Sequence, residues 1–162
     1  MYVLQTFDSP VLRQRSRPVT RVGPNEKELL KTMVTLMRKH GGVGLAAPQI
    51  GISRRMIVVE HARGLFRLIN PQIMRRTGQK IPGEEGCLSL PGITVTIRRA
   101  REILVKAVDI SGKSVTIKAQ GVLARILQHE IDHLDGKLII DYLPWYRRMF
   151  PIRRRTVRKR AV

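Results

Sequence analysis

The clearest sign of chemistry in the chain is the segment His129-Glu-Ile-Asp-His133, where two histidines stand four residues apart with an acid beside the first. On a helix, which turns by about 100° per residue, the two imidazoles lie about 40° apart around the axis and one turn apart along it. They can therefore bind one metal ion. Glu130 lies between them in angle, so its carboxylate can reach a water molecule on that ion without being a ligand. The spacing favours a hydrolytic metal centre over the polar face of an ordinary amphipathic helix.

A catalytic centre of this type uses three protein ligands and leaves one position open for water. No acid follows Asp141, which argues against a downstream glutamate ligand, and Ile139 stands where a downstream third histidine would be expected. The third ligand is therefore expected upstream. The chain has one cysteine, Cys87, and its thiolate is the best candidate. The alternative for a lone cysteine is a small buried apolar residue. Gly86 is expected to let the backbone approach closely beside it.

Two helices are predicted to hold these residues. Residues 25–41 form the first, because apolar residues recur there at helical spacing and Asn25 can cap the first turn. Residues 121–135 form the second, which carries both histidines and ends at Gly136. Residues 42–51 contain several glycines and a proline, so a buried or half-buried loop is expected there instead of a helix.

Short strands are predicted between the helices at residues 56–59, 65–69, 93–97, 103–108 and 114–118, with a hairpin turn at Ser111-Gly112. This order indicates the α+β class: antiparallel or mixed β-sheets packed around a central C-terminal helix that carries the metal motif, with an N-terminal helix. The predicted organisation is one domain, residues 1–146, followed by a basic tail, residues 147–162.

The composition limits the classes of function. The chain has 162 residues, and 43% are hydrophobic, which suits one folded domain and excludes disorder of the bulk. Its 31 Lys and Arg against 12 Asp and Glu give a net charge of +19, which makes nucleic acid or a ribosome a natural neighbour. No apolar stretch is long enough to span a bilayer and no export signal is visible, so a cytoplasmic protein is expected.

Three segments resemble the signature segments of the peptide deformylase family: Gly42-Val-Gly-Leu-Ala-Ala-Pro-Gln49, Glu85-Gly-Cys-Leu-Ser89 and Gln128-His-Glu-Ile-Asp-His-Leu-Asp-Gly136. They occur in the family's order with suitable spacing, and the similarity runs from the N-terminus to about Leu143. The resemblance implies an enzyme that removes the formyl group from the N-terminal methionine of nascent polypeptides. It also favours iron(II) in the cell, with zinc(II) or nickel(II) able to replace it.

The resemblance assigns roles by motif. Cys87, His129 and His133 would hold the metal, and Glu130 would act as general acid and base. The oxyanion would be bound by the side chain of Gln49 and the backbone N–H of Leu88. The family binds its substrate as an added extended strand. The substrate-binding positions would be Val43, Gly44, Glu85, Arg125 and Ile126.

One residue departs from the family pattern. Arg125 lies four residues before His129, where the family usually has an apolar residue that lines the methionine pocket. A guanidinium there would narrow the pocket, extend out of it, or attract an acidic substrate.

Several neighbouring residues allow two interpretations. Glu85 is either exposed or buried against Arg99. Asp132 and Asp135 are either solvated charges or hydrogen-bond partners of the ligand histidines. The remaining histidines, His40 and His61, are expected at the surface.

Three functions remain open on the residues alone: a deformylase, another metallo-amidase or peptidase with the same site, and a basic ribosome- or RNA-binding protein with a structural metal. A structural site would be closed by four ligands, which disfavours the last. The resemblance supports the ribosome as the partner of the arginine-rich tail, whereas neither a membrane nor specific DNA is expected.

Overall fold

The structure is a computed structural model that describes residues 2–148, with only the backbone described for residues 147 and 148. The rest of the predicted basic tail lies outside these residues. The elements in chain order are η1 (Pro10–Arg13), α1 (Pro24–Lys39), β1 (Gly44–Ala46), η2 (Ala47–Ile50), β2 (Met56–His61), β3 (Gly64–Cys87), β4 (Leu90–Val108), β5 (Ser114–Gln120), α2 (Gly121–Leu134), η3 (Ile139–Tyr142) and α3 (Trp145–Arg148). Among them, no helix has the length and apolar character needed to cross a bilayer.

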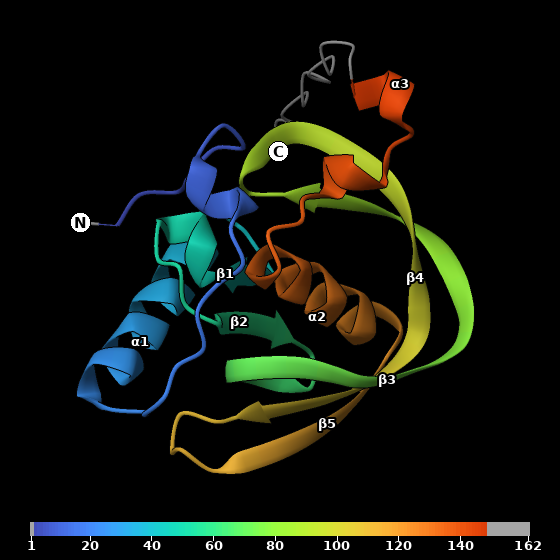
Figure 1. Ribbon diagram of the computed structural model, residues 1–162. Coiled ribbons are helices and arrows are strands. Elements are labelled where there is room, and N and C mark those ends of the chain that lie inside the picture. The colour runs from blue at the N-terminus through green and yellow to red at the C-terminus, as the bar shows by residue number, and fades with distance from the viewer. Residues whose placement is uncertain (1, 149–162) are drawn as a thin grey trace, which may run out of the picture.

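The strands form one antiparallel sheet in the order β1-β2-β3-β4-β5, which follows the chain. The prediction of an α+β fold with antiparallel pairing is confirmed, although the pairing gives one continuous sheet. Figure 1 shows that β3 and β4 curl around α2, while α1 lies on the other side of the molecule. The sheet therefore places strand residues from the middle of the chain beside the helix that carries the two histidines.

The predicted strand lengths were wrong for the two central strands. β3 has 24 residues and extends the predicted strand 65–69 through residues that looked like turns. β4 has 19 residues and joins the two predicted strands 93–97 and 103–108 into one. The register shifts between Ile69 and Gln72 and again between Thr77 and Lys80, where Pro71 and Gly78 stand. Such bulges absorb residues that a regular ladder cannot pair, and they bend the strand without ending it.

α1 begins one residue before the predicted bound, and its cap differs from the prediction. Gly23, not Asn25, precedes the first turn, and Glu26 Oε2 accepts a hydrogen bond from the Gly23 N–H at 2.9 Å. Glu26 Oε1 also accepts one from Arg54 at 2.6 Å, which ties the first turn to the segment before β2. The buried face of α1 packs on one core cluster with residues of β1 and β2.

α2 is docked on β4 by a side-chain amide. Gln128 accepts a hydrogen bond from the Ala100 N–H at 3.3 Å and donates one to the Ala100 carbonyl at 3.0 Å, as a neighbouring strand would. The helix ends before Gly136, as predicted. That glycine has a φ of +74°, and a Cβ there would meet the Arg13 carbonyl oxygen at 2.7 Å. The start of the histidine motif is therefore fixed to β4, and its end packs closely against η1.

Residues 42–51 are more regular than the predicted loop. β1 pairs with β2, and η2 follows it directly, with residues 44–50 buried. Pro48 occupies the first turn of η2, where its missing N–H has no helical acceptor to lose. The Gln49 Oε1 atom accepts a hydrogen bond from the Ala46 N–H at 2.8 Å, so the Gln49 side chain is held across the turn.

Candidate active site

Three donor atoms from two distant parts of the chain meet beside α2. Cys87, His129 and His133 offer ligand atoms that all lie within 4.8 Å of one another. The His133 Nε2 atom is 3.3 Å from the Cys87 Sγ and 3.2 Å from the His129 Nε2. Cys87 is the last residue of β3, and both histidines lie on one face of α2. The predicted third donor is thus brought to the histidine pair by the pairing of β3 with β4.

These donors fit a divalent cation. The His129 Nδ1 atom lies 3.0 Å from the Glu85 Oε2 and donates to it, so a neutral His129 presents the lone pair of its Nε2 to the other two donors. Burial lowers the pKa of His129, but hydrogen bonds to Cys87 and Glu85 raise it to about 10. Burial also lowers the pKa of His133, which keeps this imidazole neutral as a ligand must be. Positive charge is thus favoured on the His129 side of the donor set, next to Cys87 and Glu85, and a divalent cation bound there would supply it.

Glu85 is the centre of a buried ionic network behind His129. Its Oε1 accepts from Arg99 Nε at 3.0 Å, and its Oε2 accepts from Arg99 Nη2 at 2.9 Å. Of the two interpretations of Glu85, the buried pair with Arg99 is therefore confirmed. Burial alone would raise the pKa of Glu85, but the hydrogen bonds from His129 and Arg99 outweigh it and lower that pKa to about 2. Glu85 is therefore an anion that fixes the His129 ring.

Arg125 joins the same network. Its Nη1 atom donates to Glu85 Oε1 at 2.8 Å and to the Ile97 carbonyl at 2.9 Å, and its Nη2 donates to the Ile81 carbonyl at 2.7 Å. A Cβ at Gly83 would lie 2.7 Å from this guanidinium, so the glycine leaves room for it. Arg125 lines the cavity as expected, but Glu85 compensates its charge, which removes the reason to expect attraction of an acidic substrate.

Glu130 is buried next to the three donors, with 3% of its surface exposed. Among the described residues its Oε2 atom has no hydrogen-bond partner, and burial raises its pKa to about 7. A Cβ at Gly44 would collide with the Glu130 carboxylate. The glycine in β1 therefore makes the space that this carboxylate occupies, and leaves the oxygen free for a proton or a water molecule.

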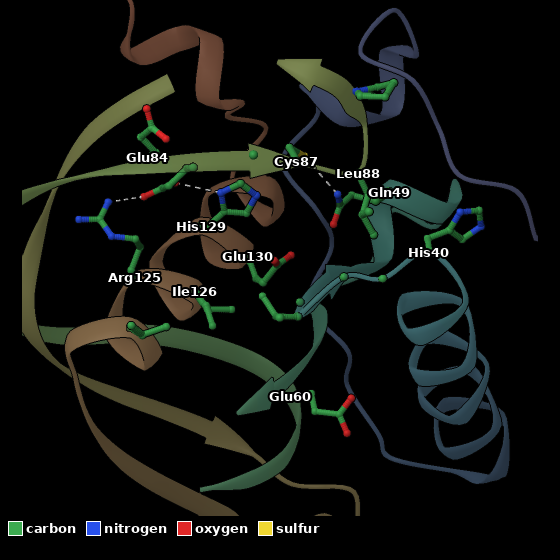
Figure 2. A pocket seen from close by; sticks show the side chains of 18 of the residues that line it. His40, Gln49, Glu60, Glu84, Cys87, Leu88, Arg125, Ile126, His129 and Glu130 are labelled. Carbon is green, nitrogen blue, oxygen red and sulfur yellow. Dashed lines mark hydrogen bonds and ion pairs between the residues drawn. The ribbon is translucent and has the colours of Figure 1, made fainter. Parts of the chain in front are cut away.

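Gln49 completes the polar part of the site. Because its Oε1 is held by the Ala46 N–H, its Nε2 donor points to the Cys87 Sγ at 3.4 Å and to the Ser89 Oγ at 3.3 Å. Figure 2 shows Gln49, Cys87, Glu130 and His129 around one cavity. A neutral amide held in place beside the three donors is suited to a developing negative charge.

The cavity has a volume of about 870 Å³ and gathers nearly the whole predicted site. The donor residue His133 is buried, with 1% of its surface exposed, and is not among the lining residues. The predicted residues among its lining are Val43, Gly44, Gln49, Glu85, Cys87, Leu88, Arg125, Ile126, His129 and Glu130.

Four titratable side chains among the other lining residues were not predicted as part of the site. His40 and His61 were expected simply at the surface, and they line the cavity together with Glu60 and Glu84. Glu60 accepts two hydrogen bonds from Arg38, at 2.6 and 3.1 Å. These residues come from the end of α1, the end of β2 and late β3, and nothing in their local sequence connects them. Only the tertiary fold brings them to one cavity.

The acids of the motif helix and the glycine before Cys87 have roles other than those expected. Asp132 accepts from Arg99 and from the Tyr142 hydroxyl, and thus supports the network without touching a ligand histidine. Asp135 pairs with Arg55 at 2.7 Å. Gly86 was expected to allow a close backbone approach, yet a Cβ there would meet nothing nearer than 3.9 Å.

One thiol and two imidazole donors, a buried carboxyl and a fixed amide meet at one cavity. These are the parts of a mononuclear metallohydrolase.

Comparison with known proteins narrows this class. The family model described as "Polypeptide deformylase" matches residues 1–148. A peptide deformylase of Thermotoga maritima is 42% identical over 162 residues, which are 100% of this chain and 95% of that protein. One of Halothermothrix orenii is 48% identical over 140 residues, which are 85% of this chain and 90% of that protein. The chain belongs to the polypeptide deformylase family.

Solved structures agree with this assignment. The crystal structure of peptide deformylase from Thermotoga maritima matches with a TM-score of 0.86 and 44% identity, covering 89% of this chain and 98% of that one. The Ehrlichia chaffeensis peptide deformylase in complex with actinonin matches with a TM-score of 0.88 and 36% identity, covering 91% of each chain. The resemblance found in the three sequence segments is thereby confirmed over the whole fold.

Proposed function

We propose that this protein hydrolyses the formamide bond of N-formylmethionine at the start of nascent polypeptides and releases formate. Membership of the family supports the reaction. The single observation in this chain that carries it is the meeting of Cys87, His129 and His133 beside the buried Glu130 carboxyl at one cavity. A different amide or peptide hydrolase would need the same parts, so the choice of substrate is what an assay must decide.

Cys87, His129 and His133 are the proposed metal ligands, with iron(II) as the metal in the cell and zinc(II) or nickel(II) able to replace it. One thiolate and two neutral imidazoles leave a divalent site with a net charge near +1. When bound, the cation supplies a Lewis acid that lowers the pKa of water and polarises the formyl carbonyl.

Glu130 is the proposed general acid and base. Its unpartnered Oε2 can accept a proton from the attacking water and later give it to the amine that leaves. A pKa raised towards 7 by burial suits a group that must both take and give a proton near neutral pH. Gly44 keeps this carboxylate in position by leaving it room.

The oxyanion is proposed to be bound by the Gln49 Nε2 and the backbone N–H of Leu88. Gln49 already has its donor group turned to the site, because Ala46 holds the other end of the amide. Preorganised donors of this kind stabilise charge as it develops and require no rearrangement during the reaction. Leu88 lines the same cavity directly after Cys87.

The substrate chain is proposed to bind beside β1, which is an edge strand of the sheet. An extended peptide can add to such an edge through backbone hydrogen bonds, here at Val43 and Gly44. The first side chain would then face Ile126 and the stem of Arg125, while Glu85 holds the Arg125 head group. This places a largely apolar wall beside the methionine.

The setting of the enzyme is also proposed. Residues 1–146 would form the catalytic domain, and residues 147–162 a basic tail that contacts the ribosome, where the nascent substrate emerges. The net charge of +19 supports a polyanionic partner. The cytoplasm is the expected location.

A formate-release assay tests the proposed function directly. The full chain loaded with iron(II) or zinc(II) is expected to release formate from a short formyl-Met peptide and to leave its peptide bonds intact. Cys87→Ala and His133→Ala should lose both metal and turnover, because two remaining ligands cannot hold and tune the ion. Full metal content with normal turnover in either variant would contradict the ligand set. Cleavage of the peptide bond without formate release would instead assign a peptidase.

A further inference from the structure

A second cavity, of about 730 Å³, lies on the opposite side of α2 from the metal-binding face. α2 contributes Ile131 and Asp135 to its lining, and at about 100° per residue these point away from His129 and His133. The other walls come from residues 15–18, from Arg55 and from the bulged part of β3. None of its lining residues lines the first cavity, so the deformylase reaction does not account for it.

The cavity is strongly basic. Arg15, Arg17, Arg55 and Arg76 line it, against the single acid Asp135. Asp135 is already paired with Arg55 at 2.7 Å, and Arg55 also donates to the Leu134 and Pro71 carbonyls at 3.3 Å. Within residues 2–148, no carboxylate pairs with the other three arginines. These three exposed arginines line one cavity without a carboxylate partner.

A buried hydroxyl lies among these cations. Ser16 is 3% exposed, and its Oγ has no hydrogen-bond partner among the described residues, which is uncommon for a buried polar group. The backbone around it is fixed on both sides. The Ser16 N–H donates to the Leu134 carbonyl at 2.8 Å, and the Arg17 carbonyl accepts from the Arg55 N–H at 2.8 Å. The hydroxyl is thus a donor held in place before any ligand arrives.

We propose that this second cavity binds a phosphate group. Guanidinium groups match phosphate oxygens with paired hydrogen bonds, and the unpartnered hydroxyl of the lining residue Ser16 offers one more donor. Asp135 repels an anion, but Arg55 neutralises it at the edge of the cavity. The same chemistry fits the phosphate of a free small molecule and the phosphodiester of single-stranded RNA. The site is independent of the metal centre and of the proposed hydrolysis.

The test uses the full chain loaded with zinc and follows the backbone amide resonances of Ser16 and Arg17 during titration with inorganic phosphate. Saturable shifts of these resonances are expected. The variant R15Q/R76Q should weaken binding by about tenfold or more, because it removes charge-assisted hydrogen bonds. The matched variant R98Q/R101Q carries the same change of charge on exposed residues of β4 and should change the affinity little.

Ser16→Ala separates a built site from general attraction. It leaves the net charge unchanged and removes no hydrogen bond of the free protein, so it should weaken phosphate binding while the protein remains folded. If a short oligoribonucleotide competes with phosphate, as followed by the Ser16 and Arg17 resonances, the site exists and its natural ligand is RNA. If phosphate binds and the oligoribonucleotide does not compete, the site exists and its natural ligand is a small phosphorylated molecule. Equal weakening by the two double variants, or no shift at residues 16 and 17 at millimolar phosphate, overturns the proposal.

Discussion

The two sides of the candidate metal centre are built in different ways. One side, called the strand side, is formed by Glu85 of β3 and Arg99 of β4, together with Arg125 of α2. Each oxygen of Glu85 accepts hydrogen bonds from charged or imidazole donors. The other side, called the loop side because it was predicted as a loop, is formed by Gly44 of β1 and Gln49 of η2 opposite Glu130. Its groups are neutral apart from the Glu130 carboxyl, whose Oε2 is buried without a partner among the described residues. The strand side fixes the orientation of the His129 ring, and the loop side keeps polar atoms available for the reaction.

This difference has an energetic meaning. A buried polar atom without a partner costs about 1–3 kcal/mol, so the loop side is less stable than a fully hydrogen-bonded alternative. Removing one partner of a buried ion pair costs about 3–5 kcal/mol, because it leaves an uncompensated buried charge, so the strand side resists change. Substitutions on the loop side should therefore affect turnover first, and those on the strand side should affect metal affinity and stability first.

The strongest test of the comparison is Glu130→Gln. The amide keeps the shape of the side chain but cannot shuttle a proton, so turnover of a formyl-Met peptide should fall by about 10²–10⁴-fold. Metal content should remain that of the parent, measured by elemental analysis of the purified protein. Glu60→Gln, at the rim of the same cavity, serves as the control with little expected effect. Loss of metal in Glu130→Gln would instead make this residue a ligand.

Gly44→Ala tests the loop side without changing any charge. The added methyl group collides with the Glu130 carboxylate and displaces it. A misplacement of about 1 Å can reduce catalysis by roughly 10²-fold. Gly86→Ala is the matched control, because a Cβ there lies 3.9 Å from its nearest neighbour. Both variants should retain metal, and equal activities in the formate-release assay would show that Glu130 is not confined by β1.

Glu85→Gln tests the strand side. It removes the anion that orients His129, and it removes a negative charge that balances the positive charges of Arg99 and Arg125. Metal affinity should therefore fall by about 10–100-fold. Competition with a chelator measures this affinity. Glu84→Gln, at the preceding exposed position, should bind metal like the parent protein. If Glu85→Gln keeps its metal affinity and loses only turnover, the division between the two sides is wrong.

Arg125→Met should have the smallest effect of the four. It removes hydrogen bonds to Glu85 and to the carbonyls of Ile81 and Ile97, which join β3 and β4. We expect a loss of about 1–2 kcal/mol in the free energy of unfolding, measured with urea, because Arg99 and His129 still hold Glu85. Preference for formyl-Met over acidic first residues should be unchanged. A changed preference with unchanged stability would place the guanidinium in the substrate pocket.

The sequence predicts the site to the extent that its parts are local or few. The spacing of His129 and His133 depends only on helical periodicity, and Cys87 is the one cysteine, so elimination reaches it. The partners of Arg125 are different. They are carbonyls on two strands that become neighbours only through the bulged register of β3 with β4, which no local pattern encodes. The full length of β3 was missed for the same reason, since Pro71 and Gly78 resemble strand ends.

The proposed metal donors are synthesised at different times during translation, because they lie far apart in the chain. Cys87 precedes His133 by 46 residues. At about 5–20 residues per second, the thiol is synthesised roughly 2–9 s before the donor set can close around an ion. During that interval the thiol lacks the proposed coordination, which would protect it from oxidation once the metal is bound. With the proposed ligand set, the enzyme would therefore reach its working form only after α2 has been synthesised.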